Sequence, residues 1–126
     1  MPVVRITKED LKQRLEAGDA APQPTVLDAR LKYAFEHSTV KLPGSVRIAP
    51  GALDLTRIPK DRDLVVYDSD PDEITARSIA GELARLGYQV AVLKGGIAEW
   101  VGASFPVETK DAPKPAPPAG AAKANP

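Results

Sequence analysis

The amino-acid sequence predicts an α/β protein whose strands pair in parallel. Short apolar runs alternate along the chain with segments in which apolar residues recur at the spacing of a helix. The run over residues 64–67 is continuously apolar, as in strands that are buried on both faces of a sheet. Because helices separate the runs, crossover connections must join successive strands, and such connections give parallel, right-handed pairing.

The first half of the chain is predicted to begin with a strand over residues 3–6, followed by a helix. Thr7 is the expected N-cap, and Asp10 stands three residues later in a variant of the capping box. Gly18 is expected to end this helix. The elements expected next are a Pro-containing loop over 19–24, a strand over 25–28, a short helical stretch around Tyr33 and Phe35, a turn over 42–44 and a strand over 45–48.

The second half is predicted to hold the longest helix. Asp70 has the chemistry of an N-cap, Pro71 fits the first helical position, and Glu73 stands three residues after the cap. Apolar residues then recur on one face as far as Gly87, which is expected to end the helix. The other elements expected are a loop with a helical turn over 50–58, the strand over 64–67, a strand over 90–93 and a short helix over 97–101.

The composition limits the partners and the chemistry. Seventeen basic and seventeen acidic residues give a formal net charge of +0, so we expect neither nucleic acid nor a membrane as a partner. The chain contains no cysteine, which excludes disulfides, thiolate metal sites and a thiol nucleophile. Its start lacks the pattern of a signal peptide, and no apolar run reaches the roughly 18 residues of a membrane span, so we expect a cytoplasmic protein.

The end of the chain differs from the rest. Residues 109–126 contain mainly Ala, Pro and Lys, without periodicity and without a large apolar side chain. Such a segment cannot bury enough apolar surface to offset the entropy lost on ordering. We therefore predict a single folded domain over residues 1–108 and a disordered tail over 109–126.

Three blocks follow one another in a specific order. The first is Leu27-Asp28-Ala29-Arg30 with Leu42-Pro43-Gly44-Ser45, the second is Val65-Val66-Tyr67-Asp68 with the helical segment over 80–88, and the third is Gly95-Gly96 with Trp100 and Phe105-Pro106-Val107-Glu108. Together the blocks resemble the rhodanese-like domain family. The resemblance implies a five-stranded, mostly parallel sheet flanked by helices, with an active-site loop at the carboxyl end of the fourth strand. It also implies that Asp28 and Arg30 form a pair that braces the site.

Asp68 marks the main departure from this family. It stands where active rhodaneses keep the cysteine that carries a persulfide, and Arg77 falls too far along to match the loop arginine of the family. The resemblance therefore implies a catalytically inactive domain without thiosulfate sulfurtransferase activity, acting as a binding or regulatory module for an unknown protein or small molecule, without a cofactor. The expected binding loop consists of Asp68, Ser69, Asp70, Pro71, Asp72, Glu73, Ile74 and Thr75.

Several interpretations of this acidic loop stay open. In the first, loop amides bond the Asp68 carboxylate, while Asp70 caps the helix and Asp72 and Glu73 interact with its dipole. In the second, Asp68, Asp70 and Asp72 bind a divalent cation, or Asp68 acts as the nucleophile of a phosphatase-like enzyme. In the third, Asp68 replaces a native cysteine. Lys41 is a candidate to face this loop.

Other residues are expected to have structural roles. Trp100 is expected to pack the last helix against the sheet, and Gly95 with Gly96 to form a tight turn from strand to helix. His37 has neither a cysteine nor a second histidine near it in the sequence, so it is expected to be a surface residue.

Overall fold

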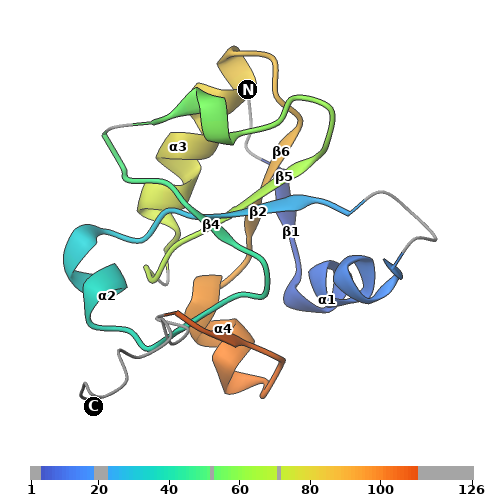
Figure 1. Ribbon diagram of the computed structural model, residues 1–126, viewed down its shortest axis with the longest axis vertical. Coiled ribbons are helices and arrows are strands. Elements are labelled where there is room, and N and C mark those ends of the chain that lie inside the picture. Colours follow the sequence, from blue (N-terminus) through green and yellow to red (C-terminus); the bar gives the residue numbers. More distant parts are fainter. Residues whose placement is uncertain (1–3, 19–22, 52, 71, 111–126) are drawn as a thin grey trace, which may run out of the picture.

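The protein forms a five-stranded parallel sheet with helices on both faces (Figure 1). The computed structural model describes residues 4–18, 23–51, 53–70 and 72–110. The sheet has the order β1-β6-β5-β2-β4, and every neighbouring pair in it is parallel. The predicted fold class and sheet are therefore confirmed. None of the helices in these segments is both long and apolar enough to cross a membrane.

The five strands of this sheet are short. They are β1 (Val4–Ile6), β2 (Thr25–Asp28), β4 (Val46–Arg47), β5 (Leu64–Tyr67) and β6 (Val90–Leu93). The helices are α1 (Lys8–Glu16), α2 (Lys32–Glu36), the 3-10 helix η2 (Leu55–Arg57), α3 (Ile74–Arg85) and α4 (Gly96–Gly102). Each of these elements overlaps a segment predicted from the sequence.

Two apolar cores lie on opposite faces of the sheet. Leu27 of β2 and Val66 of β5 belong to the core that contains the buried side chains of α3. Val26 and Tyr67 belong to the other core, with buried side chains of α1 and α4. Successive side chains of a strand point to opposite faces. Asp28 therefore lies on the α1–α4 face, and Asp68, which follows Tyr67, lies on the α3 face.

Helix α1 begins as predicted. The Thr7 side chain accepts a hydrogen bond from the backbone N–H of Asp10 at 3.1 Å, as an N-cap does. The helix ends at Glu16, and Gly18 follows with a φ of 59°, in the left-handed region. Local sequence chemistry therefore accounts for both ends of this helix.

Helix α3 begins later than predicted. Its first residue is Ile74, and Glu73, not Asp70, occupies the N-cap position, with φ 60° and ψ 30°. Asp70 instead starts a turn, because its carbonyl accepts a hydrogen bond from Glu73 N at 2.9 Å and its Oδ1 accepts one from Asp72 N at 2.8 Å. The prediction placed Pro71 at the first helical position, and Pro71 lies outside the described residues.

A second, two-stranded sheet was missed. Strand β3 (Val40–Lys41) pairs with β7 (Glu108–Thr109) in the antiparallel sense. Lys110 N also donates to the carbonyl oxygen of Thr39 at 2.9 Å, so ordered pairing extends two residues beyond the predicted boundary at 108. The rest of the predicted tail, residues 111–126, lies outside the described residues.

The turn between β6 and α4 contacts the end of β5. Gly95 and Gly96 have φ values of 79° and 62°, and Ile97 N donates to the carbonyl oxygen of Asp68 at 3.0 Å. A Cβ atom on Gly96 would lie 2.4 Å from this same oxygen. Trp100 is buried, and its Nε1 donates to the carbonyl of Pro106 at 2.7 Å, so it packs α4 against the sheet as expected.

We expect Gly96→Ala to lower the free energy of unfolding by about 2 kcal/mol or more, since it combines a backbone clash with an unfavourable positive φ. Gly102→Ala is the matched control, because no atom beyond its chain neighbours and its own helix lies within 4 Å of a Cβ there. It should be neutral or slightly stabilising. Urea unfolding of both variants measures the difference, and equal effects would contradict the proposed close approach.

Candidate functional site

The Asp68 carboxylate lies in a cradle of backbone amides at the carboxyl end of β5. Its Oδ1 accepts from Asp70 N at 3.2 Å, and its Oδ2 accepts from Ala76 N at 2.8 Å, in the first turn of α3. Asp68 as a whole is only 2% exposed. The structure therefore agrees with the interpretation in which amides of the loop and of the following helix bond this carboxylate.

The surroundings of Asp68 oppose its ionisation. Burial raises the pKa of the Asp68 carboxyl above its ordinary value, and the negative charges of Asp70 and Glu73 act in the same direction. The amides of Ala76 and Asp70 lower the pKa, but by less than burial and these charges together raise it. Since both carboxylate oxygens are engaged and buried, Asp68 is poorly placed to attack a substrate.

Glu73 is the centre of an ion-pair cluster that the sequence did not indicate. Arg5 of β1 donates from Nε and Nη2 to the two Glu73 oxygens, at 2.9 and 2.7 Å. Gly95 N donates to Glu73 Oε2 at 3.0 Å, and an Arg77 nitrogen lies 3.5 Å from Oε1. The Glu73 side chain is 2% exposed, so it connects β1, the β6–α4 turn and α3 from a buried position.

The predicted binding loop does not gather its side chains around one point. The carboxylate of Asp68 is bonded inside the fold, and that of Glu73 is bonded to Arg5. Ser69, Asp72 and Ile74 are exposed, whereas Asp70 and Thr75 are half-buried. Within the described segments, no group of three or more His, Cys, Asp or Glu side chains is placed to hold a metal ion.

Asp28 and Arg30 form a buried ion pair on the other face of the sheet. Arg30 Nη2 donates to Asp28 Oδ2 at 2.7 Å, and Arg30 Nε donates to Oδ1 at 3.0 Å. Both residues are 1% exposed. Arg30 Nη2 also donates to the carbonyl of Val40 at 3.1 Å, so the pair holds the chain near β3 in place. It braces the α1–α4 face, away from the Asp68 carboxylate.

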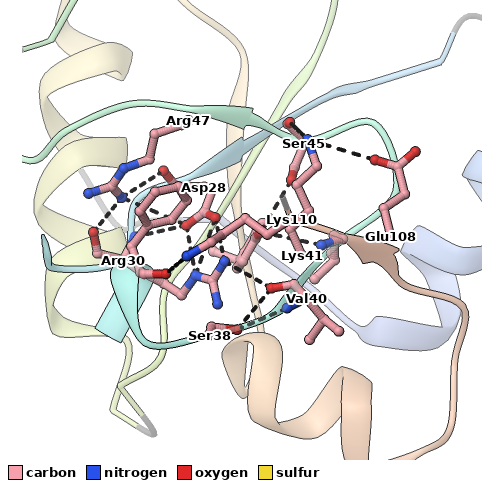
Figure 2. Close-up of polar contacts among 12 residues, drawn as sticks. Asp28, Arg30, Ser38, Val40, Lys41, Ser45, Arg47, Glu108 and Lys110 are labelled. Atoms are coloured by element: carbon pink, nitrogen blue, oxygen red, sulfur yellow. Dashed lines mark hydrogen bonds and ion pairs between the residues drawn. The ribbon is translucent and has the colours of Figure 1, made fainter. Parts of the chain in front are cut away.

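A basic hollow lies beside this ion pair (Figure 2). Lys41 forms part of its lining, and its Nζ donates to the carbonyl of Ser45 at 3.1 Å and lies 3.7 Å from Glu108. The Lys41 side chain therefore contacts Ser45 and Glu108 rather than the acidic loop. Sequence reasoning did not find this hollow, because its basic residues come from separate segments. His37 is exposed, as expected.

A second hollow, of about 350 Å³, lies beside Glu73 and includes Arg5, Lys8 and Glu99 in its lining. Arg5 pairs with Glu73 and Lys8 pairs with Glu99 at 3.2 Å. The described lining also contains Lys94 and Glu9, so three basic side chains face three carboxylates. This hollow therefore has little excess charge with which to attract an ion.

We expect Glu73→Gln to lower the free energy of unfolding by about 1–2 kcal/mol at pH 7. Burial alone would raise the pKa of Glu73, but hydrogen bonds from Arg5 and Gly95, with nearby positive charge, bring it below its ordinary value of 4.5. Because the pKa of Glu73 is lower in the folded state, its ionised carboxylate stabilises the fold. This contribution to the free energy of unfolding is complete above about pH 4.5, and it is lost as the pH falls through the folded-state pKa.

The difference between wild type and Glu73→Gln in urea unfolding should therefore shrink on acidification. Glu82→Gln, on the exposed side of α3, is the control and should change stability little at any pH. A Glu73→Gln difference that stays constant from pH 7 to pH 3 would contradict the assigned ion pair.

Comparisons with known proteins agree with this architecture. The fold resembles the BH2092 protein from Bacillus halodurans, with a TM-score of 0.72 and 24% identity over 84% of this chain and 77% of that chain. It resembles the Alr3790 protein from Anabaena sp., with a TM-score of 0.64 and 29% identity over 84% and 83% of the two chains. The thiosulfate sulfurtransferase from Pseudomonas aeruginosa gives a TM-score of 0.70 and 22% identity over 88% of this chain and 20% of that chain.

Sequence comparison gives the family more directly. None of the curated proteins compared with the chain matches it. The profile of the rhodanese-like domain, however, matches residues 7–103, which include four of the five strands of the parallel sheet, the Asp68 cradle and the Asp28–Arg30 pair. The chain belongs to the rhodanese-like domain family.

Proposed function

We propose that this protein is a rhodanese-like domain without sulfurtransferase activity that acts as a binding or regulatory module. The observation that carries the proposal is the Asp68 carboxylate, which occupies the amide cradle at the end of β5. Sulfur transfer in this family passes through a persulfide on a cysteine at this position. A carboxylate cannot take up a sulfane sulfur, and the chain contains no cysteine that could do so.

The charges around the cradle support this proposal. Asp70 and Asp72 follow Asp68 in the loop, so an anionic sulfur donor such as thiosulfate would meet like charge. The guanidinium groups of Arg5 and Arg77 lie next to the loop, but both interact with Glu73. Together with Asp70 and Asp72, Glu73 gives this region three carboxylates against the two guanidinium groups, so the region has no excess of positive charge to hold an anion.

The relative named as a thiosulfate sulfurtransferase shares the fold at 22% identity, and its activity is its own. Asp68 is buried, and each of its carboxylate oxygens accepts a hydrogen bond, so it also gives no support to a phosphatase-like reaction. A location in the cytoplasm stays a prediction.

We expect wild-type protein to form no thiocyanate from thiosulfate and cyanide above a blank without protein. Asp68→Cys supplies the thiol, and Asp68→Ser is the matched control without one. Because of the acidic loop, we expect Asp68→Cys to show weak activity, which rises when Asp70→Asn and Asp72→Asn are added. Circular dichroism shows whether each variant is folded.

Thiocyanate formation by wild-type protein would contradict the proposal outright. High activity of Asp68→Cys alone would show that the loop is still suited to thiosulfate. In that case the wild-type protein would lack only the nucleophile, and the negative charges of Asp70 and Asp72 would not hinder thiosulfate.

A further inference from the structure

The basic hollow lies at the β4 edge of the sheet, beside the Asp28–Arg30 pair, and concentrates unmatched positive charge. It has a volume of about 280 Å³, and its lining includes Lys41, Arg47, Arg57 and Lys110, together with Asp28 and Phe35. These basic residues come from β3, β4, η2 and the segment just after β7. Figure 2 shows Lys41, Arg47 and Lys110 around the Asp28–Arg30 pair.

Few carboxylates balance these cations. The Asp28 carboxylate accepts hydrogen bonds from two side-chain nitrogens of Arg30, and its Oδ1 lies 3.8 Å from Nη1 of Arg47. Glu108 lies 3.7 Å from Lys41 and is about half exposed. Among the residues that the structure describes, Arg57 and Lys110 form no ion pair.

Two further carboxylates lie in the neighbourhood. Glu36 is close enough to act on the charge of Arg47, and the charge of Arg57 acts on Asp54. Neither carboxylate comes within ion-pair distance of these arginines, and both are exposed. Water and salt therefore screen the charges of Glu36 and Asp54 more strongly than they screen the charge of the half-buried Arg47.

Neutral groups hold the cations in position. Arg47 Nη1 donates to the carbonyl oxygens of Asp28 and Arg30, and the Arg47 guanidinium lies 4.2 Å from the centre of the Phe35 ring. The Lys110 ammonium donates to the Phe35 carbonyl and lies 4.2 Å from the same ring centre. Arg57 Nη1 donates to the Arg47 carbonyl at 3.1 Å.

Carbonyls and an aromatic ring fix these side chains without cancelling their charge, so less conformational entropy is lost when an anion binds. Arg47 keeps its remaining guanidinium nitrogens as possible donors, and a guanidinium matches the geometry of an oxyanion. The described lining itself carries four basic side chains and one carboxylate, and such an excess of positive charge favours a dianion over a monocarboxylate.

We propose that this hollow binds a dianionic phosphate group, either as inorganic phosphate or as the phosphomonoester of a small molecule. The proposal rests on the binding-module function and names its ligand class. The site is separate from the Asp68 cradle, because none of the cradle residues Asp68, Asp70 and Ala76 lines the hollow. The hollow therefore does not depend on the position that the family uses for its cysteine.

Isothermal titration calorimetry of the full chain with inorganic phosphate and with glycerol 3-phosphate, at constant ionic strength, tests the proposal. We expect saturable binding of at least one of them, weakened about tenfold in the double variant Arg57→Gln with Lys110→Gln. Arg62→Gln with Arg85→Gln removes the same charge from exposed positions elsewhere and should change the dissociation constant less than about twofold.

Amide chemical-shift changes locate the ligand. We expect them around Asp28, Phe35, Arg47 and Arg57, and not around Asp68 and Ala76. Tighter binding of glycerol 3-phosphate would identify a phosphomonoester as the source, and tighter binding of inorganic phosphate the free ion. Thermal unfolding shows whether the variants are folded.

Absence of saturable binding to wild-type protein would overturn the proposal. Equal weakening by the two double variants would also overturn it, as would shift changes centred on the Asp68 loop. The thiocyanate assay is independent of these measurements. Failure of phosphate binding would therefore leave the proposed lack of sulfur transfer standing. Equally, sulfur transfer by the wild-type protein would leave a measured phosphate site standing.

Discussion

The amide cradle at the end of β5 is the constraint on which this site depends. A parallel strand that runs into a helix leaves backbone N–H groups unpaired, and these groups favour a negative charge. Here the charge is part of the chain, because Asp68 accepts from Asp70 N and Ala76 N. A buried carboxylate is tolerated only when such donors compensate for its lost hydration. Occupation of the cradle from within therefore satisfies these amides without an external ligand.

Glu73 determines how the loop reaches α3. Its carboxylate is buried against Arg5 and Gly95 N, and its backbone adopts a left-handed conformation that is uncommon for a residue with a side chain. The ion pair connects β1, at the edge of the sheet, to the start of the helix. The tertiary contact thus outweighs the local preference for Asp70 as N-cap, and the helix begins at Ile74.

The predictions from sequence succeeded where structure depends on nearby residues. The run over 64–67 and the cap at Thr7 are local signals, and both correspond to elements of the fold. The β3–β7 pair joins residues nearly 70 positions apart, in strands too short to show any alternation. Arg5 and Glu73 are equally distant in sequence, so no local pattern could reveal their bond. The basic hollow was missed for the same reason, since its cations come from separate elements.

The amide cradle and the basic hollow treat anions in opposite ways. On the α3 face, amides that could hold an anion are taken by Asp68, and the acidic loop repels further negative charge. At the β4 edge, Arg30 already neutralises Asp28, and Arg57 and Lys110 form no ion pair among the described residues. A formal net charge of +0 conceals this separation. Local fields, more than total charge, decide where an anion concentrates. An anionic ligand should therefore be attracted to the hollow at the β4 edge, although the cradle is where the fold by itself would direct it.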